Sequence, residues 1–299
     1  MFDWIYSGMG WILRQIYELL DQIGIGYYAL AILLFTILVT VVFLPLTMKQ
    51  QRASAKQASL RPKLEALKEK CGDDQRRYQT EMQALYRKEN VSMMGGCWTM
   101  LVRLPFLWGV WMAIRSPLTY ILGIEKGVID KAATTLKIAE NAADKELIIV
   151  QKINELGAGF DGLKAQVLDM NFNLFGLNLT EIPVFSLNFS TVSWIWLIPI
   201  LSFATAMLSS VVTMNMQKKT NPQAGNMGCM MLGMPIISLV IAFGMPGAVG
   251  FYWACSNLVN MVVQICMNKY YGPHTVLAKD AAKTVAVRKG KELALKEQQ

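Results

Sequence analysis

The sequence lacks the residues that most catalytic and metal sites need. Because His274 is the single histidine, any site that requires two histidines, such as a zincin motif, is excluded. No GxxxxGK[ST] loop is present to hold a nucleotide phosphate. The five cysteines form no CxxC pair, and four lie in or near apolar blocks, which is typical of small buried hydrophobes. We therefore expect no enzymatic chemistry, no metal and no cofactor.

Charge is also scarce, and apolar residues gather into blocks. Only 17% of the residues are charged, whereas 54% are hydrophobic. A membrane helix needs about 20 apolar residues. Five blocks approach or reach that length, which predicts an all-α polytopic membrane protein with five transmembrane helices: 27–46, 97–114, 194–214, 227–243 and 248–267. The GMPG stretch at 244–247 predicts a tight turn between the last two.

The distribution of Lys and Arg predicts the orientation. Segments 48–96, 215–226 and 268–299 hold eleven, two and seven of them, against seven on the opposite side. Because positively charged loops stay cytoplasmic, we expect the N-terminus outside and the C-terminus inside a bacterial plasma membrane. The net charge of +8 is mainly a topology signal, with anionic lipid or ribosomal RNA as candidate partners.

These patterns divide the chain into seven segments. Apolar residues at helical spacing in the first segment predict an amphipathic helix on the outer surface. Residues 48–95 are charged and helix-prone, with a break at 71–74, which predicts a cytoplasmic helical hairpin; Pro62 should limit its first helix. The expected segments are an interfacial helix at 1–26, transmembrane helix 1 at 27–47, the hairpin at 48–95, transmembrane helix 2 at 96–117, an outer loop with an inserted helical segment at 118–193, transmembrane helices 3 to 5 at 194–268, and a basic cytoplasmic tail at 269–299.

Polar residues inside the apolar blocks fall on helix faces. Spacings of three and four residues place each set on one side of its helix. Arg103 is permanently charged, and no Asp or Glu lies in any expected span. An intramembrane charge normally faces a bundle interior or a hydrated cavity. We expect a hydrophilic groove lined by Arg103, Thr40, Thr99, Ser202, Thr205, Ser209, Asn257, Asn260 and Gln264. Two alternatives to a groove stay open. In the first, the hydroxyls and amides only form hydrogen bonds between neighbouring helices or with their own backbone. In the second, the Arg103 side chain extends to the cytoplasmic headgroups.

Six stretches of the sequence form a distinctive set: FLPLTMKQ at 43–50, LRPKLEALKEK and EMQALYRKEN in the hairpin, GGCWTMLVRLPFLWGVWMAIRSP at 95–117, NLFGLNLT at 173–180, and TNPQAGNMGCMMLGMPIISLVIAFGMPGAVGFYWACSNLVNMVVQ at 220–264. Together they resemble the YidC family of membrane protein insertases. The resemblance covers about 27–272 except the middle of the outer loop. It implies five spans, a groove closed toward the outside, and insertion and folding of membrane proteins without ATP.

This chain departs from that family at the groove. Many bacterial members carry Arg where Thr40 stands, and commonly Gln where Arg103 stands. Thr40 lies seven residues from Thr47, and Arg103 lies seven from Gly96, so both are at similar depth. We interpret this as a groove charge moved from the first span to the second.

The function expected from these features is that of an insertase and membrane chaperone. Its expected partners are nascent membrane proteins and lipids, with the ribosome, through the hairpin and basic tail, and a Sec-type translocon as further candidates; a monomer would suffice. A small-molecule or ion transporter is the alternative from another class, although no inverted repeat is detected. A scaffold that assembles subunits without inserting them is the third.

Overall fold

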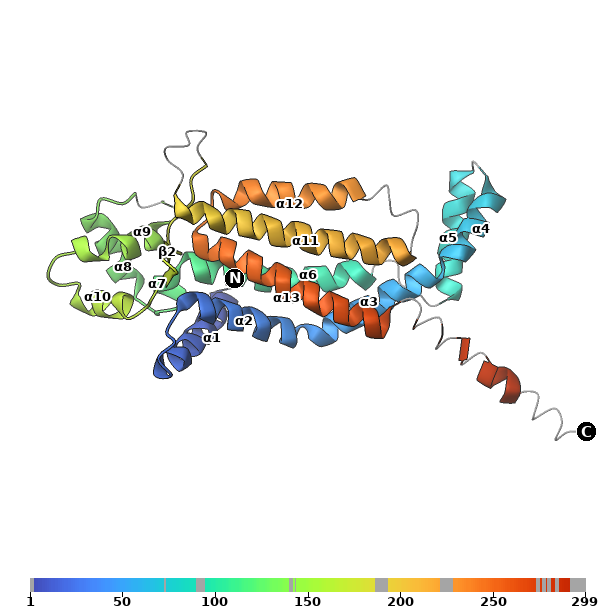
Figure 1. Ribbon diagram of the computed structural model, residues 1–299, viewed down its shortest axis with the longest axis horizontal. Helices are drawn as coiled ribbons and strands as arrows, with labels where there is room; N and C mark the ends of the chain where they lie inside the picture. The colour runs from blue at the N-terminus through green and yellow to red at the C-terminus, as the bar shows by residue number, and fades with distance from the viewer. Residues whose placement is uncertain are drawn as a thin grey trace, which may run out of the picture. The chain divides into compact units, whose positions relative to one another are not determined.

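A computed structural model describes most of the chain (Figure 1). The described residues are 3–72, 74–89, 95–139, 142, 144–185, 193–220, 228–272, 275, 278, 281–282 and 285–290. Within them helices dominate, and the sheet has two strands, β1 (Asn173–Leu174) and β2 (Leu177–Asn178). The all-α fold class is confirmed.

The chain divides into two compact units. The first comprises Met1–Val42, Val102–Met214 and Gly225–Met261, and the second comprises Phe43–Leu101, Asn215–Ala224 and Val262–Gln299. Each unit is described by itself below.

Among the described residues, two helices are long and apolar enough to cross a membrane. They are 194–216, which covers η3 (Trp194–Trp196) and most of α11 (Leu197–Thr220), and 247–270 in α13 (Gly247–Tyr271). A third span is counted if α2 (Tyr28–Val42) and α3 (Leu44–Ser59) form one broken span. Shorter apolar stretches lie in α6 (Gly95–Arg115) and α12 (Gly228–Ala242). An all-α membrane protein is supported, and the five-span layout stays a prediction.

The first expected span does not run as one helix. α2 ends at Val42, and α3 begins at Leu44 with Pro45 in its first turn. Proline has no backbone N–H and its ring crowds the carbonyl four residues earlier, so a helix breaks readily just before it. The break after Val42 therefore has a local cause in the sequence.

Helices α12, α11 and α13 lie side by side in the first unit (Figure 1). A Cβ atom added at Gly250 of α13 would lie 2.9 Å from Cγ2 of Ile198 in α11. The rings of Trp196, the last residue of η3, and Phe243, just after α12, meet edge to face at 5.1 Å. Small residues permit this close approach of helix backbones, as is common in membrane helix pairs.

Residues 117–180 form a small helical subdomain, here called the loop subdomain. Its elements are α7 (Pro117–Tyr120), α8 (Lys126–Thr135), α9 (Lys145–Gln151), η1 (Ile153–Glu155), α10 (Asp161–Leu168), β1 and β2. Leu118, Ile129, Ile149 and Leu179 are fully buried and belong to the same core cluster as Ile32 of α2. Burying each such side chain stabilises the fold by roughly 1.5–3 kcal/mol. The loop subdomain is therefore continuous with the helix bundle of its unit.

Helix α1 (Asp3–Gln22) packs on this core with one face. Leu13, Tyr17 and Leu20 are buried, whereas Trp4 and Trp11 are exposed. The Tyr17 hydroxyl donates to the Asp169 carbonyl at 2.9 Å and accepts from the backbone N–H of Asn171 at 2.9 Å.

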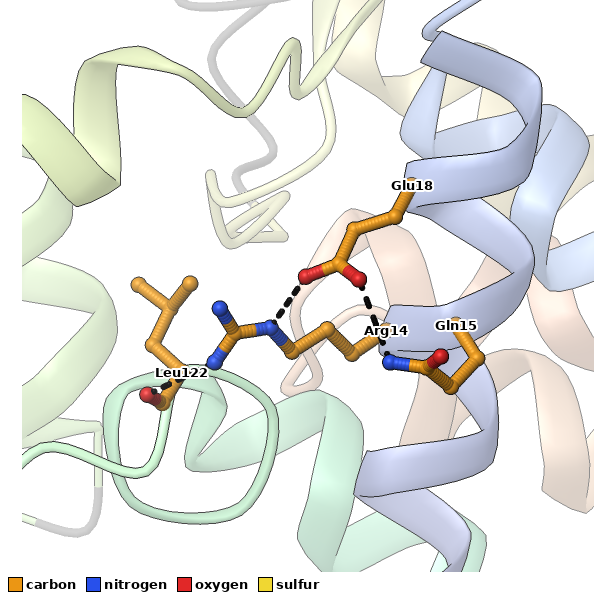
Figure 2. A network of polar contacts seen from close by, with 4 residues as sticks. All are labelled: Arg14, Gln15, Glu18 and Leu122. Carbon is orange, nitrogen blue, oxygen red and sulfur yellow. Dashed lines mark hydrogen bonds and ion pairs between the residues drawn. The ribbon is translucent and has the colours of Figure 1, made fainter. Parts of the chain in front are cut away.

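A polar network also fastens α1 to the loop subdomain (Figure 2). Arg14 pairs through Nε with Glu18 at 2.6 Å and donates through a terminal nitrogen to the Leu122 carbonyl at 3.2 Å. Gln15 donates to the second carboxylate oxygen of Glu18 at 3.1 Å. The hydrogen bond from Arg14 to Leu122 joins positions far apart in sequence. It therefore adds to the apolar face in orienting α1 on the loop subdomain.

In the second unit, α3 is followed by α4 (Arg61–Cys71) and α5 (Gln75–Lys88). The Asp74 side chain caps α5 by accepting from the N–H of Arg77 at 3.0 Å. Lys63 near the start of α4 forms an ion pair with Glu89 just after α5, which requires the two helices to run antiparallel. These helices occupy the segment expected to form the cytoplasmic hairpin.

Candidate intramembrane polar site

The polar stripes of α11 and α13 meet each other. Asn257 of α13 donates from its amide nitrogen to the Ser202 carbonyl at 3.3 Å and to Oγ1 of Thr205 at 3.4 Å, both on α11. Ser202 and Thr205 are 2% and 6% exposed. Both bonds are longer than the usual 2.9–3.0 Å, so they hold the helix pair together weakly. Three of the expected groove residues therefore lie together at one helix–helix contact.

The Thr205 hydroxyl in this contact bonds mainly to its own helix. Oγ1 of Thr205 lies 2.9 Å from the carbonyls of Leu201 and Ser202. A hydroxyl has one proton to donate and two lone pairs, so Thr205 can donate within α11 while it accepts from Asn257. The Asn257 amide nitrogen and the Thr205 hydroxyl therefore both have hydrogen-bond partners within the two helices.

The remaining polar residues of α13 do not all point to α11. Asn260 donates to the Ser256 carbonyl at 2.7 Å and to the Ser256 hydroxyl at 3.0 Å, both one turn earlier on the same helix. Gln264 is half-buried and lies about one turn further along α13, and Ser209 is half-buried on α11. Asn260 and Gln264 therefore present partly exposed amides on the helix.

Helix α2 contributes two stacked threonines. Oγ1 of Thr36 donates to the Ile32 carbonyl at 2.7 Å, and Oγ1 of Thr40 donates to the Thr36 carbonyl at 2.8 Å. Both side chains are buried. Thr36 was not among the residues expected at the groove, although its spacing of four from Thr40 was a signal available in the sequence.

Helix α6 carries the two other expected residues, Thr99 and Arg103. Their backbone is helical, and their side chains lie outside the described part of the structure. Further along α6, a Cβ added at Gly109 would lie 3.2 Å from Cγ2 of Ile5, so α1 crosses this helix closely. Gly109 is about 9 Å beyond Arg103 along the helix at 1.5 Å per residue. The direction of the guanidinium group stays a prediction.

The end of α6 is tied to the loop subdomain by charged groups. Arg115 pairs with Asp144 at 2.9 Å and lies over the ring of Trp111, 4.9 Å from its centroid. The buried carboxylate of Glu146 accepts from the backbone N–H of Thr119 at 3.0 Å and from its hydroxyl at 2.6 Å. Burial raises the pKa of Glu146, and these hydrogen bonds oppose the shift without cancelling it.

Within the described residues, no cluster of histidine, cysteine or acidic side chains could hold a metal ion. The arrangement offers instead neutral hydroxyl and amide groups on three apolar helices. Such a set can form hydrogen bonds with a polar segment. The acidic groups described above, Asp144 and Glu146, lie in the loop subdomain.

Comparisons with known proteins identify a family. The sequence profile of the family described as 60Kd inner membrane protein matches residues 20–274. The chain is 38% identical over 114 residues to the membrane protein insertase YidC of Pseudoalteromonas atlantica, which covers 37% of this chain and 21% of that protein. It is 34% identical over 113 residues to the protein of the same name from Stenotrophomonas maltophilia, covering 38% and 19%. It is 38% identical over 111 residues to that from Neisseria meningitidis, covering 37% and 19%. The matched segment thus spans about a fifth of each of these relatives.

Proposed function

Because the chain belongs to the 60Kd inner membrane protein family, we propose that it inserts membrane proteins into the lipid bilayer and helps them to fold. The match of the family profile across residues 20–274 is the observation that carries this proposal. The apolar helices of the first unit and the polar contact of Asn257 with α11 support it.

The mechanism that we propose lowers the barrier for moving a polar segment through hydrocarbon. Arg103 would supply a positive charge within the bilayer, and Thr40, Thr99, Ser209, Asn260 and Gln264 would supply hydrogen-bonding groups along a hydrophilic groove. An acidic or polar flank of a substrate would bind there transiently. The apolar helix of the substrate would then partition into lipid, and this burial would supply the free energy without ATP.

Ser202, Thr205 and Asn257 have a more limited role in this proposal. Two of them are almost fully buried, and Asn257 binds both across the α11–α13 contact. This favours the reading that they hold the two helices together. The groove function then depends more on Arg103 and on the partly exposed amides of Asn260 and Gln264.

The proposed setting is a bacterial plasma membrane, with the N-terminus outside and the C-terminus in the cytoplasm. The eleven Lys and Arg residues of 48–96 and the seven of 268–299 support this orientation. Nascent membrane proteins are the proposed partners, with the hairpin of α4 and α5 and the basic tail as the surfaces toward ribosomes. Cooperation with a Sec-type translocon is compatible with the proposal, which requires only a monomer.

The direct test is insertion of a single-span substrate with an acidic outward tail into liposomes that contain the purified protein. Arg103→Ala should reduce insertion strongly, and Arg103→Lys should retain most of it because the charge is kept. The double variant Arg103→Gln with Thr40→Arg should recover activity if the charge can come from either helix. Thr40 is 7% exposed, so recovery also requires that α2 accommodate the longer side chain.

Full activity of Arg103→Ala would contradict a groove charge and favour a snorkelling anchor. Crosslinking from Asn260 then separates the functional classes. An insertase should crosslink nascent chains, a scaffold should crosslink only mature subunits, and a small-molecule transporter should crosslink neither.

A further inference from the structure

The β hairpin of the loop subdomain ends in a large apolar side chain that no described residue of its unit covers. Asn173 pairs with Asn178 and Leu174 with Leu177, so Phe175 and Gly176 form a two-residue turn. The side chains of Leu174 and Leu177 pack against the core. Phe175, by contrast, is 98% exposed.

The backbone at Phe175 is also unfavourable for this residue type. Phe175 has a φ of 49° and Gly176 a φ of 85°, the positive values of a type I′ turn. Asn, Asp and Gly are the usual residues at the first of these positions, because a bulky side chain there crowds its own backbone. The chain therefore keeps a strained phenylalanine that forms no compensating contact within the described residues.

Backbone hydrogen bonds place this hairpin where two apolar helices begin. The N–H of Tyr28, the first residue of α2, donates to the Asn171 carbonyl at 3.0 Å. The N–H of Ala248, in the first turn of α13, donates to the Leu179 carbonyl at 2.7 Å. Apolar spans begin at the boundary between headgroups and hydrocarbon. At about 3.3 Å per residue, Phe175 lies within about 13 Å of that boundary.

Other aromatic side chains lie at the same end of the helices. Trp194, at the beginning of the span that contains α11, is 85% exposed. Phe185 stacks on Trp196 at 5.8 Å and meets Phe243 edge to face at 5.3 Å. Aromatic residues concentrate at membrane interfaces, where their rings occupy the headgroup layer.

We propose that Phe175 inserts into the interfacial layer of the bilayer and anchors the loop subdomain to the membrane surface. The occupant of the exposed ring is lipid, at the boundary between headgroups and acyl chains. Lipid contact removes the ring from water, which offsets the backbone strain. This anchor goes beyond the insertase proposal, because it requires only that α2 and α13 enter the bilayer.

Photocrosslinking of the full chain in phosphatidylethanolamine and phosphatidylglycerol liposomes tests the anchor. p-Benzoylphenylalanine replaces Phe175 in one variant and Gln166, exposed on α10 of the same subdomain, in a matched control. Mass spectrometry should find phospholipid adducts at 175 in several-fold higher yield than at 166. Adducts only to protein, a second copy included, or equal lipid yields at both sites would overturn the proposal.

Phe175→Asn provides an independent measurement. Asparagine tolerates positive φ, so this change should relieve strain and, by itself, slow hydrogen exchange of residues 171–181. If Phe175 is a lipid anchor, exchange of these amides in nanodiscs should instead become faster than in the wild type. Slower or unchanged exchange in nanodiscs would refute the anchor.

Discussion

A single methyl group at Gly10 should separate α1 from the loop subdomain. A Cβ added there would lie 2.0 Å from the carbonyl oxygen of Tyr120, a backbone atom that cannot rotate away. Ordinary contact begins at 3.4 Å, so Gly10→Ala must displace α1 from α7 by about 1.4 Å. Gly8, two residues earlier on the same helix, has no atom within 4 Å of its added Cβ. Gly8→Ala is therefore a matched control.

The expected loss follows from the buried face of α1. A gap of 0.5–1 Å already forfeits about a quarter to a half of a van der Waals contact. Leu13, Tyr17 and Leu20 are buried on this face, and each contributes roughly 1.5–3 kcal/mol. Because the displacement exceeds 1 Å, we take about half of that total as lost, which is about 2–4.5 kcal/mol, while replacing a helical glycine by alanine returns up to about 1 kcal/mol. The net change for Gly10→Ala is a destabilisation of about 1–3.5 kcal/mol.

Hydrogen exchange of α1 in nanodiscs measures this change. Gly10→Ala should speed exchange of the α1 amides by about 5- to 300-fold, since 1.4 kcal/mol corresponds to a factor of ten. Gly8→Ala should leave exchange unchanged or slow it, because it gains helix propensity without a clash. Equal behaviour of the two variants would refute the close packing of α1 on α7.

Two further predictions concern polar groups. Because burial raises the pKa of Glu146, the folded state binds more protons than the unfolded state. The contribution of Glu146 to the free energy of unfolding should be present at low pH and be lost as the pH rises through its folded pKa. The melting temperature of Glu146→Gln should not show this decline with pH. Parallel pH profiles of the variant and the wild type would contradict the prediction. Asn257→Leu removes the donor to Ser202 and Thr205 and should destabilise the α11–α13 contact by about 0.6 kcal/mol, at most about 1.7. Steric trapping in bicelles measures that cost, and a loss of insertion without a loss of stability would assign Asn257 to the groove instead.

The sequence predicted the helices well where composition is uniform over a long stretch. The apolar blocks at 194–214 and 248–267 lie within the spans at 194–216 and 247–270, because length and hydropathy alone decide such helices. The hairpin break expected at 71–74 matches the gap between α4 and α5, where Gly72 has a φ of 55° and Asp74 caps α5. Local signals of glycine and capping residues were sufficient there.

The loop subdomain shows what sequence patterns could not provide. The outer loop at 118–193 was expected to contain an inserted helical segment, and α8 and α9 lie there. Their burial against Leu118, Leu179 and Ile32 depends on contacts between distant parts of the chain, which periodicity does not encode. The turn at Phe175 was missed for a different reason. Phenylalanine is rare at positive φ, so Phe175 does not indicate a two-residue turn, although Gly176 is compatible with one.

The groove residues illustrate the same limit at the level of hydrogen bonds. Helical spacing identified polar faces, but it could not tell which partners each side chain would choose. Thr40 and Thr205 both bond a carbonyl of their own helix, a choice open to any threonine in a helix.

This pattern of bonds has a chemical consequence for the interior of the bundle. A threonine that donates its proton to its own backbone keeps lone pairs that can only accept a hydrogen bond. Thr36 and Thr40 stack in this way on α2, and Thr205 does so on α11. These three threonines therefore offer acceptors, and the Asn257 amide already uses one of them. Arg103, with five donors and no acceptor, is chemically complementary to such a lining. In the proposed groove, threonine oxygens would accept hydrogen bonds from the guanidinium before an acidic substrate segment binds. This would offset the cost of a charge in spans that contain no Asp or Glu.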